Sequence, residues 1–121
     1  MQMLDRLLTM TSFDLLFERQ IANIGPAWQR IARILHASIS EIYPNYELVQ
    51  IKSKLGAMRY YIDYSSINSD DISKAIMTLI SSAESATFTM CSNCGGYKDP
   101  KSKNGVLHSN FNDRCKDCGD I

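Results

Sequence analysis

The sequence has little of what marks several large classes of protein. Its 121 residues include 13 basic and 13 acidic side chains, so the formal net charge is zero. Proteins dedicated to nucleic acid usually carry an excess of positive charge that binds phosphates, so the overall charge argues against nucleic acid as the main partner. Proline and glycine are also scarce, with 3 and 6 residues, and 45% of the residues are hydrophobic. This composition indicates a folded globular chain.

Long apolar runs are missing as well. No segment approaches the run of about 20 apolar residues that a membrane-spanning helix needs. Near the amino terminus, charged residues interrupt the apolar stretches at Asp5, Arg6, Asp14, Glu18 and Arg19, which leaves no room for a secretory signal. We therefore expect a cytoplasmic protein that makes no contact with a membrane.

Sequence motifs of known catalytic sites are absent too. The chain has two histidines, His36 and His108, and neither lies in an H-E-x-x-H motif or in an ordered Ser–His–Asp set. There is no glycine-rich phosphate loop, and the carboxylates are scattered singly. Because no constellation of catalytic groups is visible, we predict that the protein is not an enzyme.

What the sequence does have is two pairs of cysteines near its carboxyl end. Cys91 and Cys94 form one C-x-x-C-G motif, and Cys115 and Cys118 form a second. Two such motifs can bring four thiolates to the tetrahedral geometry of a structural zinc site, which leaves no position open for a substrate. We predict one structural Zn²⁺ bound by these four cysteines, the alternative being reduced or disulfide-bonded cysteines without metal.

Apolar periodicity predicts the elements that precede the cysteines. Helical spacing indicates helices over about 13–24, 26–42 and 69–90, with Pro26 in the first turn of the second and Ser69 as the cap of the third. Between them, the spacing changes to a period of two over residues 46–64, where Val49 and Ile51 share one face. The predicted fold is α+β, with helices packed on a β-hairpin followed by a C-terminal zinc ribbon. A composition shift at residue 90 divides it into a core, 1–90, and a ribbon, 91–121.

Several of these features occur together in one known pattern. The pattern has a helix with glycine and tryptophan, a hairpin that reads QIK-x-K-[FL]-G-x-[LM]-R-[FY]-Y, a helix with an Ala-Glu pair, and a C-x-x-C-G ribbon. In this chain the matching positions are Gly25, Trp28, Ile51, Lys52, Lys54, Gly56, Arg59, Tyr60, Ala83, Glu84 and the four cysteines. From about Gly25 to Cys118 the sequence thus resembles a family of small uncharacterised bacterial and prophage proteins. The resemblance implies the helix–hairpin–helix core and the ribbon, and it transfers no activity.

The predicted hairpin also carries the candidate partner-binding residues. Lys52, Lys54, Arg59 and Tyr61 lie in a stretch, residues 49–61, that contains no acidic side chain. We interpret the protein as a non-catalytic interaction module, a phage- or mobile-element-encoded regulator or inhibitor that binds a larger host protein through these residues.

Two other interpretations of the same residues stay open. Basic residues interleaved with aromatic ones can bind single-stranded nucleic acid by phosphate contacts and base stacking, as a transcription regulator could. In this interpretation Lys52, Lys54 and Arg59 act together with the lysines of the ribbon loop, Lys98, Lys101 and Lys103. The side chains of the hairpin could instead be a solvated strand face, or form salt bridges with Asp63, Asp70, Asp71 or Glu84 on neighbouring elements.

Overall fold

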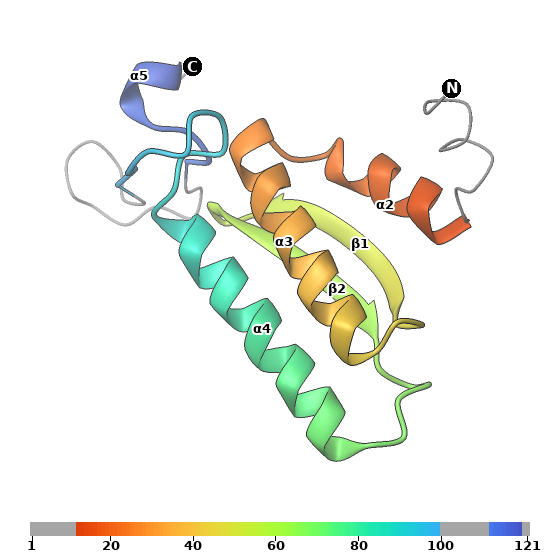
Figure 1. Cartoon of the computed structure of the whole chain (residues 1–121). Coiled ribbons are helices and arrows are strands. Elements are labelled where there is room, and N and C mark those ends of the chain that lie inside the picture. Colours follow the sequence, from red (N-terminus) through yellow and green to blue (C-terminus); the bar gives the residue numbers. More distant parts are fainter. Residues whose placement is uncertain (1–11, 100–111, 120–121) are drawn as a thin grey trace.

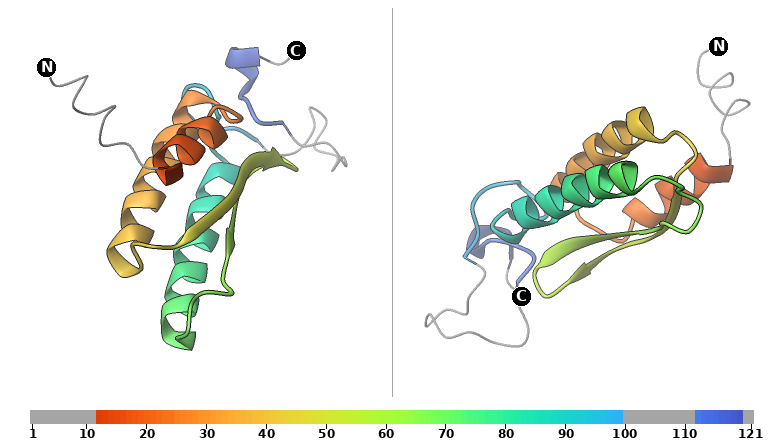
Figure 2. Two further views of the ribbon diagram at one scale, coloured as in Figure 1. Left: turned by 90° about the vertical axis from the view of Figure 1, so that its right-hand side faces the viewer. Right: turned by 90° about the horizontal axis from the view of Figure 1, so that it is seen from below.

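The computed structural model describes residues 12–99 and 112–119 of the chain. In chain order its elements are α2 (Ser12–Ile21), α3 (Pro26–Ile42), β1 (Glu47–Lys54), β2 (Ala57–Asp63), α4 (Asp70–Phe88) and the short α5 (Lys116–Gly119). The two strands form an antiparallel hairpin, and α3 and α4 lie side by side over one of its faces (Figures 1 and 2). The α+β class predicted from the sequence is confirmed.

The helix boundaries follow local chemistry. Pro26 is in the first turn of α3. A backbone N–H at this position has no acceptor within the helix, so proline, which lacks the N–H, loses no hydrogen bond there. The Oγ atom of Ser69 accepts a hydrogen bond from the Ile72 N–H at 3.2 Å and so caps α4. One boundary differs from the prediction: α2 ends at Ile21 instead of continuing to Ile24, because the chain turns there before α3. Among the described helices, none combines the length and apolar character needed to cross a membrane.

The hairpin has one irregularity that the sequence pattern did not predict. A shift in register between Leu48 and Gln50 leaves Val49 without an opposite residue. Such a bulge turns the following residues over to the other face of the strand. Val49 is therefore 55% exposed while Leu48 and Ile51 are buried, so the expectation that Val49 and Ile51 share a face is wrong.

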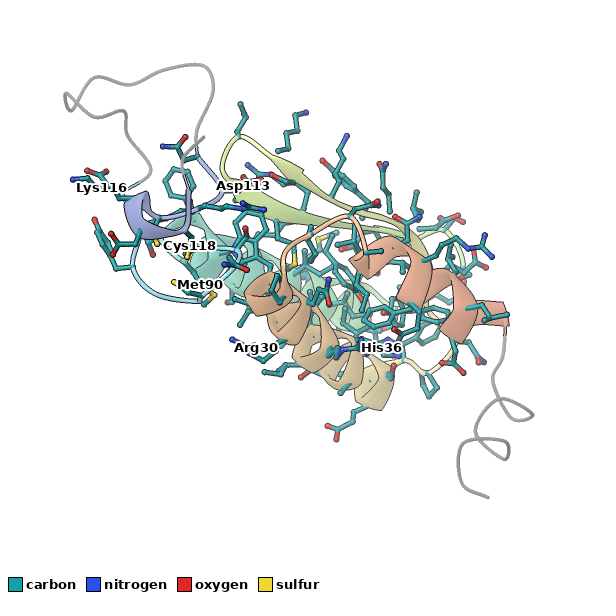
Figure 3. All side chains as sticks on the ribbon, turned by 90° about the horizontal axis from the view of Figure 1, so that it is seen from above. Arg30, His36, Met90, Asp113, Lys116 and Cys118 are labelled. Carbon is teal, nitrogen blue, oxygen red and sulfur yellow. The ribbon has the colours of Figure 1, made fainter. Side chains whose placement is uncertain are left out.

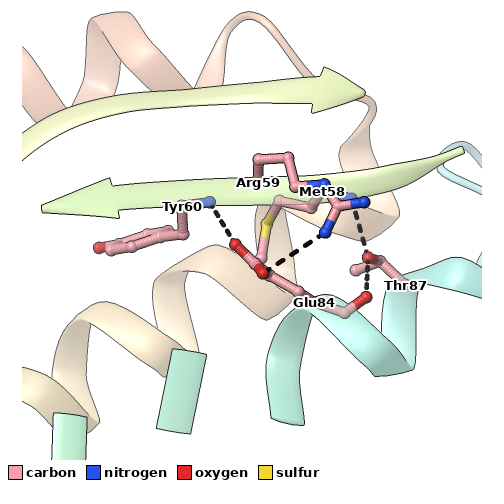
Figure 4. Close-up of polar contacts among 5 residues, drawn as sticks. All are labelled: Met58, Arg59, Tyr60, Glu84 and Thr87. Atoms are coloured by element: carbon pink, nitrogen blue, oxygen red, sulfur yellow. Dashed lines mark hydrogen bonds and ion pairs between the residues drawn. The ribbon is translucent and has the colours of Figure 1, made fainter. Parts of the chain in front are cut away.

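Side chains from α2, from the turn after it and from α4 hydrogen bond to the two outer edges of the hairpin. On the β1 edge, Gln20 Oε1 accepts the Ile51 N–H at 3.0 Å, and Asn23 Nδ2 donates to the Ile51 carbonyl at 3.1 Å. On the β2 edge, Glu84 Oε2 accepts the Tyr60 N–H at 2.8 Å, and Thr87 Oγ1 accepts the Met58 N–H at 2.9 Å (Figure 4). Unpaired edges invite pairing with further strands. These contacts occupy the positions in the middle of both edges.

The core lies between the hairpin and the helices. It contains Phe17, Ile21, Ile24, Trp28, Ala32, Leu35, Ile39, Tyr46, Leu48, Ile51, Met58, Tyr60, Ile76 and Ile80. Trp28 is fully buried, as its place in the apolar stripe of α3 predicts, and its Nε1 donates to the Met90 carbonyl at 2.8 Å. That bond ties the centre of the core to the residue before the first cysteine.

Candidate metal centre and hairpin face

The fold brings the four cysteines together at one end of the molecule. Their Sγ atoms all lie within 4.8 Å of one another, and those of Cys94 and Cys115 are 3.8 Å apart. In a tetrahedral site with zinc–sulfur bonds of about 2.3 Å, two sulfurs are separated by about 3.8 Å. The donor set and its spacing therefore fit a single metal ion bound by Cys91, Cys94, Cys115 and Cys118, as the sequence motifs predict.

The backbone of the first motif points N–H groups at its own sulfurs. The N–H groups of Asn93 and Cys94 donate to Cys91 Sγ at 3.4 and 3.5 Å, and that of Gly96 donates to Cys94 Sγ at 3.3 Å. This tight turn requires a φ of +81° at Gly95, which glycine adopts most readily. The glycine of the C-x-x-C-G motif thus allows the backbone to surround the thiolates with donors.

These contacts change the acidity of the sulfurs in opposite directions. Burial favours the neutral thiol of Cys91, but the backbone N–H groups of Cys94, Cys115 and Asn93 outweigh it and lower the pKa of Cys91 to about 6. At Cys118, the Asn93 side chain favours the thiolate, whereas the sulfurs of Cys115 and Cys94 oppose it and raise the pKa of Cys118 to about 11. A bound cation would supply the charge that makes all four sulfurs thiolates.

The first cysteine motif is also part of the packing at the start of α3. The Ser92 carbonyl accepts hydrogen bonds from the Ala27 N–H at 2.8 Å and the Trp28 N–H at 3.4 Å. These N–H groups belong to the first turn of α3, where no intrahelical acceptor exists. The chain approaches so closely that a Cβ atom on Gly25 would lie 2.5 Å from the Ser92 oxygen.

The second cysteine motif has fewer contacts with the core. Asp113 accepts from the Ser92 N–H through its backbone carbonyl at 2.7 Å. Its carboxylate accepts from Ser53 Oγ, on β1, at 2.6 Å. Figure 3 shows Asp113, Cys118 and Met90 gathered at this end of the molecule. Asp113 therefore links the second motif both to the first motif and to the hairpin.

Lys98 has a candidate role within the fold that sequence reasoning missed. Its side chain is only 2% exposed. Its Nζ donates to the carbonyls of Gly56 at 2.8 Å and Phe88 at 2.6 Å, and lies 5.5 and 6.0 Å from the ring centroids of Phe88 and Trp28. Burial lowers the pKa of Lys98, while the charges of Asp113 and Cys91 act in the opposite direction. Nothing in the local sequence marks this lysine, because its surroundings come from distant segments.

The structure divides the candidate residues of the hairpin into two groups. Arg59 Nη1 lies 3.7 Å from Glu84 Oε1, which is the salt bridge that the sequence left open as an alternative (Figure 4). Lys52 and Lys54 form no ion pair within residues 12–99 and 112–119. The Nζ of Lys52 lies 5.8 Å from the centroid of the Tyr61 ring, at the upper range of a cation–π contact.

We name as the hairpin face the side chains of Gln50, Lys52, Lys54 and Tyr61, on the side of the strands away from the core. Gln50 is directly opposite Tyr61 in the register. Gln50, Lys54 and Tyr61 are exposed, and Lys52 is half-buried. His108 and two lysines of the ribbon loop, Lys101 and Lys103, lie outside the described residues.

Comparison of the chain with protein-family models, with curated proteins and with solved structures finds no match.

Proposed function

We propose that this small protein binds one structural Zn²⁺ and acts as a non-catalytic interaction module, in the manner of a phage-encoded regulator or inhibitor of a host protein. The hairpin face is the surface that contacts the larger partner. The division into a core over residues 1–90 and a ribbon over 91–121 belongs to the same proposal, with the ribbon as the metal-stabilised part.

The observation that carries this proposal is the contrast between the edges and the face of the hairpin. The helix side chains that hydrogen bond to both strand edges leave little room for a partner to bind by adding a strand. The hairpin face, in contrast, presents two lysines without an acidic partner in the described residues, beside an exposed tyrosine. Exposed aromatic side chains are enriched at protein interfaces, and charged side chains beside them steer a partner of opposite charge. They fit a protein partner with an acidic surface.

The test compares Lys52→Gln/Lys54→Gln with Lys74→Gln, which removes an exposed lysine from α4. Arg59 is left intact because its salt bridge with Glu84 is part of the fold. Host proteins retained by the wild type are identified, and the binding of each is then titrated against the purified variants. We expect the double variant to lose at least about tenfold in affinity, and the Lys74 variant to bind normally. Equal binding by all three proteins would place the contact surface elsewhere.

A second function is favoured by the position of Lys52 beside the Tyr61 ring. A base could stack on this tyrosine while the lysines bind phosphates. Single-stranded DNA and RNA oligonucleotides at low and moderate salt test this alternative, because phosphate contacts give an affinity that falls steeply as salt rises. Removing the two lysines would make that salt dependence shallower by about two units of slope.

A further inference from the structure

The turn of the hairpin has a backbone conformation that its sequence does not favour. Leu55 and Gly56 both have positive φ, +55° and +81°, as a two-residue type I′ turn requires. Glycine adopts this conformation freely, whereas a leucine in it is strained because its Cβ crowds the backbone. Such a conformation persists only when the surrounding structure holds it.

Lys98 donates a hydrogen bond to this turn. Its ammonium group donates to the Gly56 carbonyl at 2.8 Å, within the turn itself. The second hydrogen bond, to Phe88, fixes the same ammonium to the end of α4. Hydrogen bonds from a buried charged group are among the strongest in proteins. Lys98 thus joins the hairpin turn, α4 and the core around Trp28.

The backbone of Lys98 is in turn positioned by the first cysteine motif. The Cys91 N–H donates to the Gly96 carbonyl at 2.7 Å, Met90 and Tyr97 form a β-bridge, and the Lys98 N–H donates to the Thr89 carbonyl at 3.0 Å. The Gly96 N–H is engaged by Cys94 Sγ. The segment that leads to Lys98 therefore folds back around the sulfurs of the candidate metal site.

We infer that Lys98 couples metal occupancy to the conformation of the hairpin turn, so that the hairpin face is held in its binding shape while the metal is bound. This inference rests on the proposed function only in treating the hairpin face as a binding surface. The coupling itself is between the metal site and the hairpin turn. When the metal leaves, the sulfurs take up protons and the bonds that held them together are lost, so the C-x-x-C turn can open. Lys98 then shifts, the Gly56 carbonyl loses its donor, and Leu55 can leave its strained conformation. Lys54, next to Leu55, moves with it.

A second contact also connects the candidate metal site to the hairpin. The Asp113 carboxylate, which precedes Cys115 by two residues, accepts from Ser53 on β1. A bound metal holds the second motif against the first. The hydrogen bond between Asp113 and Ser53 then ties the second motif to the end of β1, next to the turn. Both cysteine motifs are therefore connected to the segment that carries Lys52 and Lys54.

The experiment measures backbone amide hydrogen exchange in the full chain, loaded with Zn²⁺ and after removal of zinc by a chelator. Three proteins are compared: the wild type, Lys98→Met, and the control Lys74→Met at an exposed lysine. In the zinc-loaded Lys98→Met protein we expect the amides of Lys54 and Ala57, which flank the turn, to exchange at least about tenfold faster than in the wild type. Removal of zinc from the wild type or the control should accelerate the same amides, with a smaller change at Ile76 and Ile80 in α4.

Leu55→Asn provides a second arm in case the Lys98 variant does not fold. Asparagine tolerates positive φ, so the turn should need Lys98 less and respond less to zinc removal than the wild type does. The coupling is overturned if the turn amides of the wild type do not respond to zinc removal, if all amides accelerate equally, or if Leu55→Asn responds as strongly as the wild type. None of these readouts needs a partner. If the proposed function were wrong but the coupling existed, the turn amides would respond to zinc as expected, while Lys52→Gln/Lys54→Gln would bind its partner as the wild type does.

Discussion

The two cysteine motifs have the same C-x-x-C-G pattern, but the structure supports them differently. The first is built into the core: Cys91 is fully buried, the Ser92 carbonyl caps α3, and Trp28 donates to Met90. The second has only half-buried cysteines. Its hydrogen bonds reach the first motif, through Cys115, Cys118 and Asp113, and the hairpin, through the Asp113 carboxylate. Packing against the core therefore positions the first motif, and we expect the second to depend more strongly on a bound metal.

The largest effect is expected from Trp28→Ala, which removes the fully buried indole beneath the first motif. We expect a loss of roughly 3–5 kcal/mol in the free energy of unfolding, measured with denaturant. Trp28→Phe retains most of the ring and loses the hydrogen bond to Met90, so it should be much less destabilising. If Trp28→Ala lowered stability by less than about 1 kcal/mol, the first motif would not be anchored in the core as described.

Gly25→Ala tests the close approach of the first motif to α3. Gly25 has φ −71° and ψ 167°, a conformation that any residue can adopt. Glycine is needed there because a Cβ atom would lie 2.5 Å from the Ser92 oxygen. We expect a loss of about 1–3 kcal/mol because the backbone must move apart. The control is Gly96→Ala, whose Cβ would meet nothing closer than Cys94 Sγ at 3.4 Å. Equal stability of the two variants in thermal unfolding would contradict the close packing.

Ser53→Ala removes the contact between the second motif and the hairpin, and its effect should be smaller. Loss of the hydrogen bond to Asp113 is worth about 1 kcal/mol, which corresponds to a decrease in zinc affinity of up to about fivefold. Competition with a chromophoric chelator measures the affinity, and Ser66→Ala, at an exposed position, is the control. An unchanged zinc affinity would show that the second motif does not depend on the hairpin.

Much of this architecture follows from local sequence signals. Pro26 and Ser69 mark helix starts by chemistry that acts within one turn, and each cysteine motif contains its own turn glycine, so both could be read from the sequence. The bulge at Val49 could not be predicted, because the period of two gives no warning of one unpaired residue.

Contacts between distant segments account for the other differences. From the sequence, Arg59 could either contact a binding partner or form a salt bridge within the fold. The packing of α4 against β2 places it beside Glu84. The burial of Lys98 likewise requires α3, α4 and the hairpin turn to meet around it. A lysine in a polar stretch gives no sign of such surroundings, because lysines are seldom fully buried.

The most direct test of the account is the metal content of the protein purified under reducing conditions. If the four cysteines form one site, elemental analysis will give one zinc per chain. Replacement by Co²⁺ will then give the intense thiolate charge-transfer bands and the visible bands of a tetrahedral all-sulfur site. Protein without bound zinc that retains the fold, or a cobalt spectrum with fewer than four thiolates, would contradict the central claim that both cysteine motifs bind a single structural ion.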